Sequence, residues 1–466
     1  LLKERYRMEQ ITKPHCGARL DRLPDCRWHS SMFAIVAFGL LVCWSNAVGG
    51  LILAQLKELG WTDNSTTATF SAITTAGMFL GALVGGIIGD KTGRRNAFIL
   101  YEAIHIASMV VGAFSPNMDF LIACRFVMGV GLGALLVTLF AGFTEYMPGR
   151  NRGTWSSRVS FIGNWSYPLC SLIAMGLTPL ISAEWNWRVQ LLIPAILSLI
   201  ATALAWRYFP ESPRWLESRG RYQEAEKVMR SIEEGVIRQT GKPLPPVVIA
   251  DDGKAPQAVP YSALLTGGLL KRVILGSCVL IAMNVVQYTL INWLPTIFMT
   301  QGINLKDSIV LNTMSMFGAP FGIFIAMLVM DKIPRKTMGV GLLILIAVLG
   351  YIYSLQTSML LITLIGFFLI TFVYMYVCYA SAVYVPEIWP TEAKLRGSGL
   401  ANAVGRISGI AAPYAVAVLL SSYGVTGVFI LLGAVSIIVA IAIATIGIET
   451  KGVSVESLSI DAVVNK

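Results

Sequence analysis

The stretch GGIIGDKTGRRNAF, residues 85–98, places one acid and three bases within six positions between two long apolar segments. A shorter stretch, DKIPRK at residues 331–336, follows another apolar segment later in the chain. The charged positions keep their mutual spacing in the two copies: Asp90, Arg94 and Arg95 recur as Asp331, Arg335 and Lys336. A charge cluster duplicated beside apolar segments indicates a chain built from two related halves.

The composition indicates a membrane protein. Of the 466 residues, 55% are hydrophobic and only 13% are charged, whereas soluble proteins carry about 25% charged residues. A net charge of +10 can indicate a nucleic-acid partner, but the bases cluster beside the apolar segments, so we predict a lipid bilayer and no nucleic acid. The seven cysteines form no CxxC pair, and the sequence predicts no disulfide framework, metal site or cofactor.

Twelve apolar segments are long enough to cross a bilayer as helices, which takes about 20 residues each. Whole segments are apolar on every face instead of alternating over about 10 residues, which excludes a transmembrane barrel. We therefore predict an all-α polytopic membrane protein with twelve transmembrane helices. Their approximate limits are 29–53, 67–89, 97–115, 118–142, 155–181, 187–208, 272–299, 307–330, 337–355, 359–384, 398–421 and 425–447.

Basic residues are distributed unevenly over the loops. The loops after even-numbered spans hold most of them, whereas the loops after odd-numbered spans hold only Lys57, Arg188 and Lys306. Because cytoplasmic loops carry the excess of Lys and Arg, we predict a multi-pass protein of the cell membrane with both termini and every even loop in the cytoplasm.

The spans fall into two groups of six. Charges at helical spacing over 214–234 predict a surface helix between the groups, and the Pro- and Gly-rich stretch 236–262 predicts a flexible linker. The predicted regions are a cytoplasmic N-terminal segment (1–28), an N-terminal six-helix bundle (29–208), a cytoplasmic connector (209–271), a C-terminal six-helix bundle (272–447) and a cytoplasmic tail (448–466).

A second repeated pattern follows spans four and ten, where Glu145 and Arg152-Gly153 recur as Glu387 and Arg396-Gly397. Two parallel six-helix repeats related by an axis along the membrane normal are implied, and such proteins bind substrate between the halves at mid-depth.

We predict that the repeated charges form a cytoplasmic gate at the seam between the halves. Exposed ion pairs contribute only about 0–1 kcal/mol each, which suits contacts that break in every transport cycle. The alternative is that the bases only set the topology. The predicted gate comprises Asp90, Arg94, Arg95, Glu145, Arg152, Asp331, Arg335, Lys336, Glu387 and Arg396.

Four motifs recur around these positions: GDKTGRR, the run from Arg125 to Gly153 that begins RFVMGVGLG, PESPRWL, and PEIWPTEAKLRGSG. Together they resemble the major facilitator superfamily, and more narrowly its sugar-porter-related metabolite symporters. The resemblance covers nearly the whole chain and implies the major facilitator fold and alternating access, often coupled to protons.

Two positions depart from that family. Sugar porters place an Asp in the first span opposite an Arg in the fourth, whereas this chain has LLVCWSN there, with Ser45 and Asn46, and keeps Arg125. Sugar porters also carry a double Gln in the seventh span, which AMNVVQYTLINWLPTIF lacks. A sugar substrate and proton coupling therefore both stay open.

Charged and titratable side chains inside membrane spans are costly and usually functional. Glu102 and His105 share one face of span three, and with Arg125 they are the predicted coupling site for protons. The alternatives are structural. Arg125 bonds to neighbouring carbonyl groups, Glu102 pairs with Arg94 or another loop base, and His105 packs against apolar neighbours.

Span seven carries a line of polar residues. Asn284, Tyr288 and Asn292 are spaced by four, so they share a helical face, and Gln287 lies beside them. We predict that they bind substrate, the alternative being amides that join helices. Further predicted substrate-binding residues are Asn164 and Trp165 of span five and Trp44 of span one.

Arg406 lies in span eleven, on one face with Asn402 and Ser398. Because Arg offers a planar fork that fits a carboxylate with two hydrogen bonds, we predict that Arg406 meets a carboxylate of the substrate. The combination of Arg406 and Pro413 also resembles the organic-anion branches of the superfamily, in which an Arg there is implicated in substrate recognition. The alternative is that Arg406 reaches the cytoplasm or pairs with Glu102 or Glu387.

These observations predict a monomeric secondary active transporter of a small polar metabolite, an organic anion such as an aromatic or sugar acid, and they leave open whether protons drive it. One alternative is an uncoupled facilitator of a sugar or another neutral metabolite. A more remote alternative, a membrane-embedded enzyme, is disfavoured because the chain has no HExxH or GxSxG motif and only three His.

Overall fold

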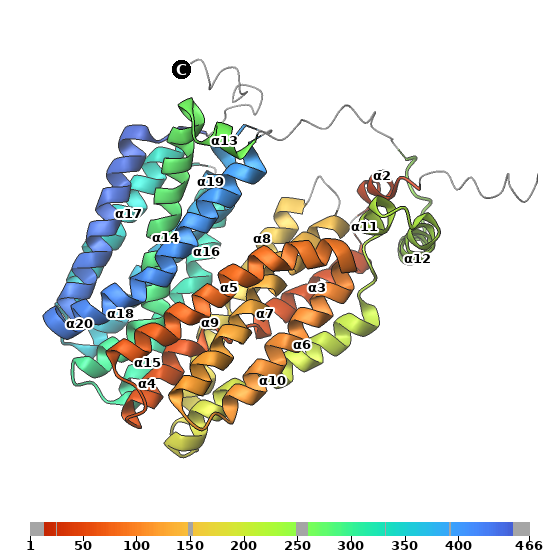
Figure 1. Ribbon diagram of the computed structural model, residues 1–466. Coiled ribbons are helices and arrows are strands. Elements are labelled where there is room, and N and C mark those ends of the chain that lie inside the picture. Colours follow the sequence, from red (N-terminus) through yellow and green to blue (C-terminus); the bar gives the residue numbers. More distant parts are fainter. Residues whose placement is uncertain are drawn as a thin grey trace, which may run out of the picture.

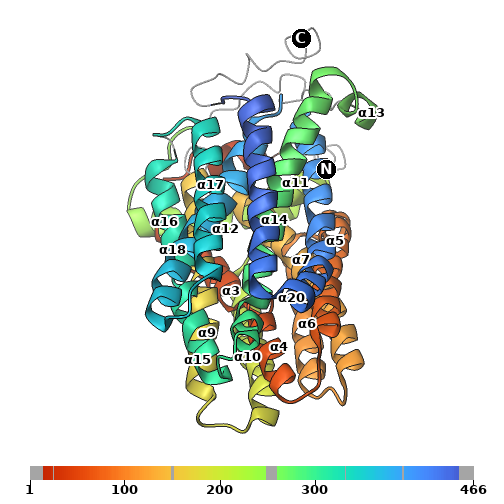
Figure 2. The same ribbon diagram turned by 90° about the vertical axis from the view of Figure 1, so that its left-hand side faces the viewer.

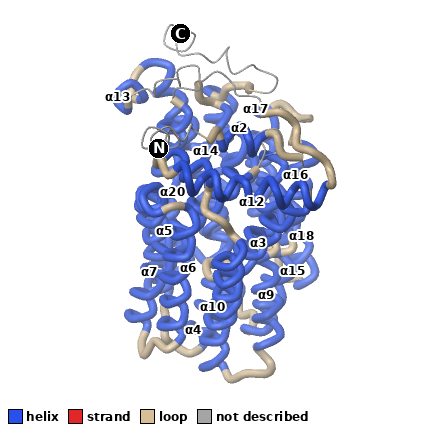
Figure 3. The backbone as a smooth tube through the Cα atoms, turned by 90° about the vertical axis from the view of Figure 1, so that its right-hand side faces the viewer, coloured by secondary structure: helices blue, strands red, loops and turns tan. Residues whose placement is uncertain are grey.

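A computed structural model describes residues 14–24, 26–147, 152–247, 260–330, 332–390 and 393–450 of the chain. All regular elements in these ranges are helical, as Figure 3 shows. The structure confirms the predicted all-α class. Its helices, in chain order, are α2 (Cys16–Asp21), α3 (Arg27–Val42), α4 (Val48–Glu58), α5 (Asn64–Thr92), α6 (Arg94–Ala113), α7 (Met118–Tyr146), α8 (Arg152–Asn164), α9 (Ser166–Leu177), α10 (Ala183–Tyr208), α11 (Pro213–Ser218), α12 (Tyr222–Thr240), α13 (Tyr261–Leu264), α14 (Gly267–Thr300), α15 (Leu305–Met316), α16 (Gly318–Val329), α17 (Arg335–Ser354), α18 (Met359–Cys378), η1 (Tyr379–Tyr384), α19 (Val385–Glu387) and α20 (Lys394–Ile446).

Each of the twelve predicted spans coincides with helical structure. Nine helices of the described ranges are long and apolar enough to cross a membrane. The difference from twelve arises because spans one and five are each divided into two short helices, α3 with α4 and α8 with α9, while spans eleven and twelve run together as α20. Within α20 the chain turns at Gly424, whose φ of 65° and ψ of −159° are not helical and belong to a region that glycine adopts readily.

The helices form two bundles, α3 to α10 and α14 to α20. Figure 1 shows them meeting around α4, α9 and α15 and diverging toward the end where α11, α12 and α13 lie. We call this end the connector end and the opposite one the far end. Figure 2, turned by 90°, shows α17, α18 and α20 running side by side in the second bundle.

The bundles are joined in the middle and at the far end. Asn64, at the start of α5, donates to the hydroxyl of Ser421 in α20 over 2.9 Å. Deeper in the molecule, Asn312 of α15 donates to the hydroxyl of Ser171 in α9 over 3.1 Å. The described polar contacts between the bundles therefore lie away from the connector end.

Span one is broken in the middle of the first bundle. Helix α3 ends at Val42, and α4 begins only at Val48. Helix α4 then packs directly on α14, because a Cβ atom on Gly50 would stand 2.5 Å from the carbonyl oxygen of Ile291. The break interrupts the helix from Cys43 to Ala47, and it leaves the carbonyl group of Ser45 free to accept a hydrogen bond from another helix.

The connector differs from the prediction in two ways. The single surface helix predicted over 214–234 is two helices, α11 and α12, separated at Gly220 with a φ of 71°. The predicted linker is wrong at its beginning, because α12 continues to Thr240, whereas residues 248–259 lie outside the described ranges. The cause is tertiary: Val236 is fully buried in an apolar cluster with Cys16 and Leu20 of α2.

Candidate functional site

The first repeated charge cluster closes the connector end of the first bundle. Arg94 donates to Asp90 over 2.7 Å and to Glu145 over 2.9 Å. Its backbone N–H donates over 2.7 Å to Glu211, which also accepts from the N–H of Arg95. Burial raises the pKa of the Glu211 carboxyl, although these N–H bonds oppose the rise. Four segments of the first bundle are thus joined through Arg94 and the half-buried acid Glu211.

The second cluster repeats this geometry in the second bundle. Arg335 binds Glu387 with two hydrogen bonds of 3.0 and 3.1 Å. The backbone N–H groups of Arg335 and Lys336 donate to Glu449 over 2.8 and 3.1 Å. Glu449 therefore has the position in the second half that Glu211 has in the first.

The sequence predicts that the gate residues pair across the seam between the halves. In the structure, each described ion pair of these residues joins two residues of the same bundle. Arg95 donates to the carbonyl group of Trp206 in its own bundle, and the guanidinium of Arg396 lies 5.2 Å from the ring centre of Tyr261. Asp331 and the side chain of Arg152 lie outside the described residues.

Sequence reasoning missed Glu211 and Glu449 as members of the clusters. Each follows the last span of its half, in PES after span six and in IET after span twelve. The sequence signal that could have identified them is an acid that follows the last span at the same place in both halves.

A chain of polar contacts runs through the interior of the first bundle. His105 lies 3.4 Å from a carboxylate oxygen of Glu102 through Nδ1, and 2.7 Å from the hydroxyl of Ser45 through Nε2. All three residues are fully buried. The predicted alternative in which Glu102 pairs with Arg94 does not occur, because Arg94 is held at the connector end by Asp90 and Glu145.

Arg125 continues this chain. It donates to the backbone carbonyl of Ser45 over 2.8 Å and to the hydroxyl of Thr74 over 3.3 Å, and its guanidinium lies 4.5 Å from the ring centre of Phe70. Glu102, His105 and Arg125, which we selected separately, are therefore linked through Ser45 at the break in span one. The bond to the Ser45 carbonyl also agrees with the alternative prediction for Arg125, a structural role in which it bonds to neighbouring carbonyl groups.

The predicted polar face of α14 contacts two other helices. A Cβ atom on Gly405 of α20 would stand 3.0 Å from the amide nitrogen of Asn284, and one on Gly409 would stand 3.0 Å from the ring of Tyr288. Farther along, one on Gly49 of α4 would stand 3.4 Å from the amide oxygen of Asn292. This face therefore lies between span eleven and the first bundle, with Gln287 half-buried beside it.

Arg406 lies one residue after Gly405 and is half-buried. Its Nη1 atom is enclosed and has no hydrogen-bond partner among the described residues. The predicted alternative partners are occupied elsewhere, Glu102 beside His105 and Glu387 on Arg335. Asn402, one turn earlier, is exposed and donates to the carbonyl of Ser398.

The remaining candidates lie near the junction of the bundles. Asn164 donates to the carbonyl of Ser160 in its own helix over 2.7 Å. Trp165, at the break in span five, stacks edge-on with Phe317 of the second bundle at 6.3 Å between ring centres. Trp44 is buried in the apolar cluster around α4, so its position indicates packing.

Comparison with known proteins places the whole chain in one group. The family described as "Sugar (and other) transporter" matches residues 31–462. The chain is 99% identical to a metabolite transport protein of Escherichia coli strain K12, YdjK, over 98% of this chain and 100% of that protein. It is 44% identical to the inner membrane metabolite transport protein YdjE of the same organism, over 97% and 99% of the two chains.

Solved structures agree on the fold. The xylose transporter XylE from Escherichia coli, in a partially occluded inward open conformation, superposes with a TM-score of 0.72 at 18% identity and covers 92% of this chain and 100% of its own.

Proposed function

Because the chain belongs to the sugar (and other) transporter family of the major facilitator superfamily, we propose that it carries a small organic anion across the membrane by alternating access, with Arg406 binding the carboxylate. The protein is a multi-pass membrane transporter of metabolites and not an enzyme. The proposal adds the substrate class and the residue that selects it.

The enclosed Nη1 atom of Arg406, which has no hydrogen-bond partner among the described residues, carries the proposal. A buried Arg nitrogen without a partner is costly, and an Arg inside a membrane span usually marks a substrate or ion pathway. No described side chain supplies the missing acceptor. A carboxylate fits the planar fork of Arg with two charge-assisted hydrogen bonds, so an anionic substrate would complete this site.

The surroundings of Arg406 favour a small cyclic acid. Gly405 and Gly409 bring α20 against Asn284 and the ring of Tyr288, so an amide and an aromatic ring of α14 lie opposite the helix turn that carries Arg406. An amide binds hydroxyl or ring nitrogen groups, and an aromatic face stacks on a planar ring. Aromatic acids and sugar acids both offer this combination.

The test is substrate binding and uptake with matched pairs of compounds. We expect purified protein to bind an aromatic acid or a sugar acid better than its uncharged amide or parent sugar. Losing the carboxylate contact in Arg406→Gln should weaken binding about ten- to a hundredfold, with partial recovery in Arg406→Lys. Arg238→Gln, an exposed residue of α12, is the matched control. Preference for the neutral compound, or full affinity in Arg406→Gln, would exclude the proposal in favour of a facilitator of neutral metabolites.

We propose further that the connector end faces the cytoplasm, since it carries the excess of Lys and Arg. The divergence of the bundles at that end then corresponds to an inward-facing state, which is also the state named for the XylE structure. Labelling of single cysteines introduced into α12 and into the loop after α4, from either side of sealed vesicles, tests the orientation.

In this orientation the two charge clusters are the candidate gate. Each cluster holds its own bundle together in the inward-facing state, and the two approach one another only when the connector end closes. Asp90→Asn should therefore slow transport while leaving the protein folded, and an unchanged transport rate would leave the clusters a structural role only.

Proton coupling stays a prediction, as does the monomeric state. The candidate residues for proton coupling, Glu102, His105 and Arg125, are linked through Ser45. Uptake of the identified substrate with and without a pH gradient separates a proton-coupled transporter from an uncoupled facilitator.

A further inference from the structure

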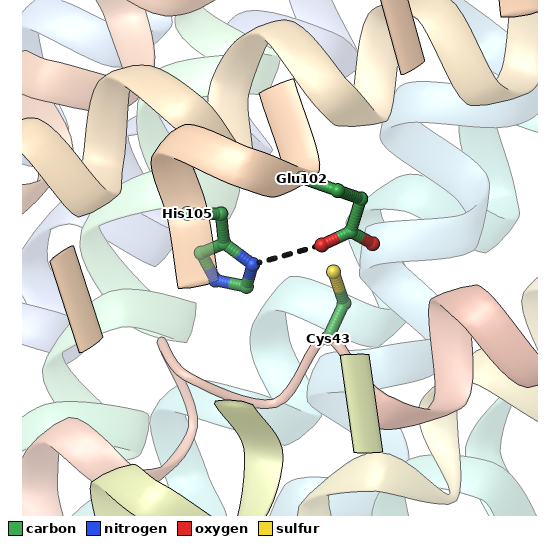
Figure 4. Close-up of side chains that lie close together, drawn as sticks. All are labelled: Cys43, Glu102 and His105. Carbon is green, nitrogen blue, oxygen red and sulfur yellow. Dashed lines mark hydrogen bonds and ion pairs between the residues drawn. The ribbon is translucent and has the colours of Figure 1, made fainter. Parts of the chain in front are cut away.

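The break in span one brings a thiol to the buried pair in span three. Cys43 is the first residue after α3, and its sulfur lies with one atom each of Glu102 and His105 in a group whose members are all within 4.8 Å of one another. Figure 4 shows the sulfur pointing toward the carboxylate of Glu102, next to the carboxylate oxygen that the dashed line joins to the His105 ring. Thiol, carboxylate and imidazole are the three side-chain types that bind zinc in proteins.

We propose that Cys43, Glu102 and His105 form a binding site for a zinc-like divalent transition metal ion. The site is independent of the substrate proposed above, and the sequence by itself predicted no metal.

The spacing of two of the atoms fits a shared metal better than a hydrogen bond. Nδ1 of His105 and Oε2 of Glu102 are 3.4 Å apart, longer than the usual 2.9–3.0 Å of a nitrogen–oxygen hydrogen bond. Two ligands at about 2.0–2.2 Å from one tetrahedral zinc ion are separated by about 3.3–3.5 Å. The sulfur of Cys43 lies within 4.8 Å of both atoms, so only a short shift separates it from a position on the same ion.

The imidazole is already oriented for this role. Its Nε2 atom is 2.7 Å from the hydroxyl of Ser45, which leaves Nδ1 directed at Glu102. Metal-binding histidines usually have their second nitrogen held in this way by a neighbouring oxygen, which sets the ring orientation.

Charge balance gives the physical reason for a divalent ion. Glu102 is fully buried, and its Oε1 atom has no hydrogen-bond partner in the described structure. A buried carboxylate with a free oxygen is costly unless a cation or a proton compensates it. A divalent ion bound by one carboxylate, one thiolate and one neutral imidazole gives a neutral group, and its binding releases the thiol proton.

Three protein ligands leave a fourth position open, as in zinc sites that exchange a ligand. Cys43 is half-buried, so the thiol is the least enclosed of the three ligands. Bound metal would tie the break in span one to span three, and we expect it to stabilise the first bundle.

The test uses tag-free, metal-stripped protein in detergent. We expect it to bind one Zn²⁺ per chain by titration calorimetry, and to show a thiolate-to-cobalt charge-transfer band when Co²⁺ replaces Zn²⁺. Cys43→Ser should abolish that band, and both Cys43→Ser and His105→Asn should weaken Zn²⁺ binding at least tenfold.

A matched control exists near the N-terminus, where Cys26 lies 3.4 Å from Nδ1 of His29. Cys26→Ser should leave the cobalt band unchanged. A band that survives in Cys43→Ser and disappears in Cys26→Ser would overturn the proposal, as would the absence of any thiolate band in the unmodified protein.

A measurement on the unmodified protein covers the case in which a variant does not fold. Zn²⁺ should protect Cys43 from alkylation, as read by mass spectrometry of its peptide, while Cys278 of α14 reacts equally with and without metal. Equal alkylation of Cys43 in both conditions would refute the site.

Discussion

The charge clusters at the connector end and the polar residues in the interior of the bundles differ in one respect. The clusters are duplicated down to the backbone bonds: Glu211 binds the start of α6 as Glu449 binds the start of α17. The interiors are not duplicated. Counted from the starts of these two helices, the positions of Glu102 and His105 in the first half correspond to Leu343 and Ile346 in the second, both buried in an apolar core.

This difference separates two kinds of constraint. Both halves need their helices held together at the connector end, so the same ion pairs serve twice. One substrate bound between the two halves contacts each half with a different part of its surface. The residues that bind it therefore need not be the same in the two halves. Residues that the repeat preserves therefore serve both halves in the same way, as helix contacts and as the candidate gate, whereas unrepeated ionisable residues in the interior are better explained by binding of a substrate or an ion.

The largest expected effect comes from introducing an acid in the second half at the position that corresponds to Glu102 in the first half. Leu343→Glu places a carboxylate in a fully buried site within an apolar core. We expect a loss of at least about 3 kcal/mol in the free energy of unfolding, seen as aggregation or a large fall in melting temperature in detergent. Leu343→Met, the control, should cost less than about 1.5 kcal/mol. A stable, functional Leu343→Glu protein would show that the asymmetry has no energetic basis.

The two arginines of the clusters allow a sharper comparison. The Arg335 side chain is 7% exposed and that of Arg94 is 18% exposed. Arg335→Met leaves Glu387 without its ion-pair partner and should lower the free energy of unfolding by about 3 kcal/mol. This value is at the low end of the range for broken buried ion pairs, because about a third of the Glu387 side chain is exposed. Arg94→Met should cost about 1–2 kcal/mol. Thermal unfolding of both variants side by side measures the ratio, and a larger loss for Arg94→Met would contradict the order given by burial.

The acids that bind the helix starts should act through hydrogen-bond acceptance. Glu211→Ala removes the acceptor for three backbone N–H groups and Glu449→Ala removes it for two, a loss of about 1–2 kcal/mol each by analogy with helix caps. Glu211→Gln keeps an acceptor oxygen and should cost less than about 0.5 kcal/mol. Equal losses in the Ala and Gln variants would instead implicate the charge.

The same site predicts a pH effect of known sign. Burial raises the pKa of Glu211, so folding favours the protonated acid. The stability of the protein should therefore rise as the pH falls from above the raised pKa toward about 4.3, the ordinary value for Glu. Glu211→Gln should abolish this rise, and thermal unfolding at a series of pH values measures it.

The smallest effect is expected where α2 contacts α12, as seen at the connector end in Figure 3. Burial alone would raise the pKa of Glu233, but hydrogen bonds from Arg19 and Arg22 outweigh it and hold the pKa below the usual value. A lowered pKa means stability that is present above about 4.3 and lost as the pH falls through the lower folded value.

We therefore expect hydrogen exchange in α12 to accelerate only at pH values below about 4, with an effect of about 1 kcal/mol or less. Glu233→Gln should show fast exchange already at pH 7. Glu224→Gln, which removes an exposed partner of Arg221 only, is the control. Fast exchange in the control as well would show that α12 depends on its overall charge and not on α2.

Much of the fold was predictable because a bilayer imposes a simple rule on the sequence. A helix that crosses it needs about 20 apolar residues, and this requirement can be read without knowing which helices touch. The repeat, the two halves and the residue types of the clusters follow from local spacing in the same way.

The partners of the charged residues could not be read in this way, because they come from distant parts of the chain. Glu211 reaches Arg94 across 117 positions, and Arg19 reaches Glu233 across 214. The sequence showed that Glu102, His105 and Arg406 are ionisable side chains inside apolar spans and therefore need partners. Only the packing of the helices decided that Ser45 and Cys43, freed by the break in span one, lie beside the first two, and that Arg406 has no described partner. The physical reason is that a hydrogen bond depends on positions within a few ångströms, which the apolar pattern of a span does not determine.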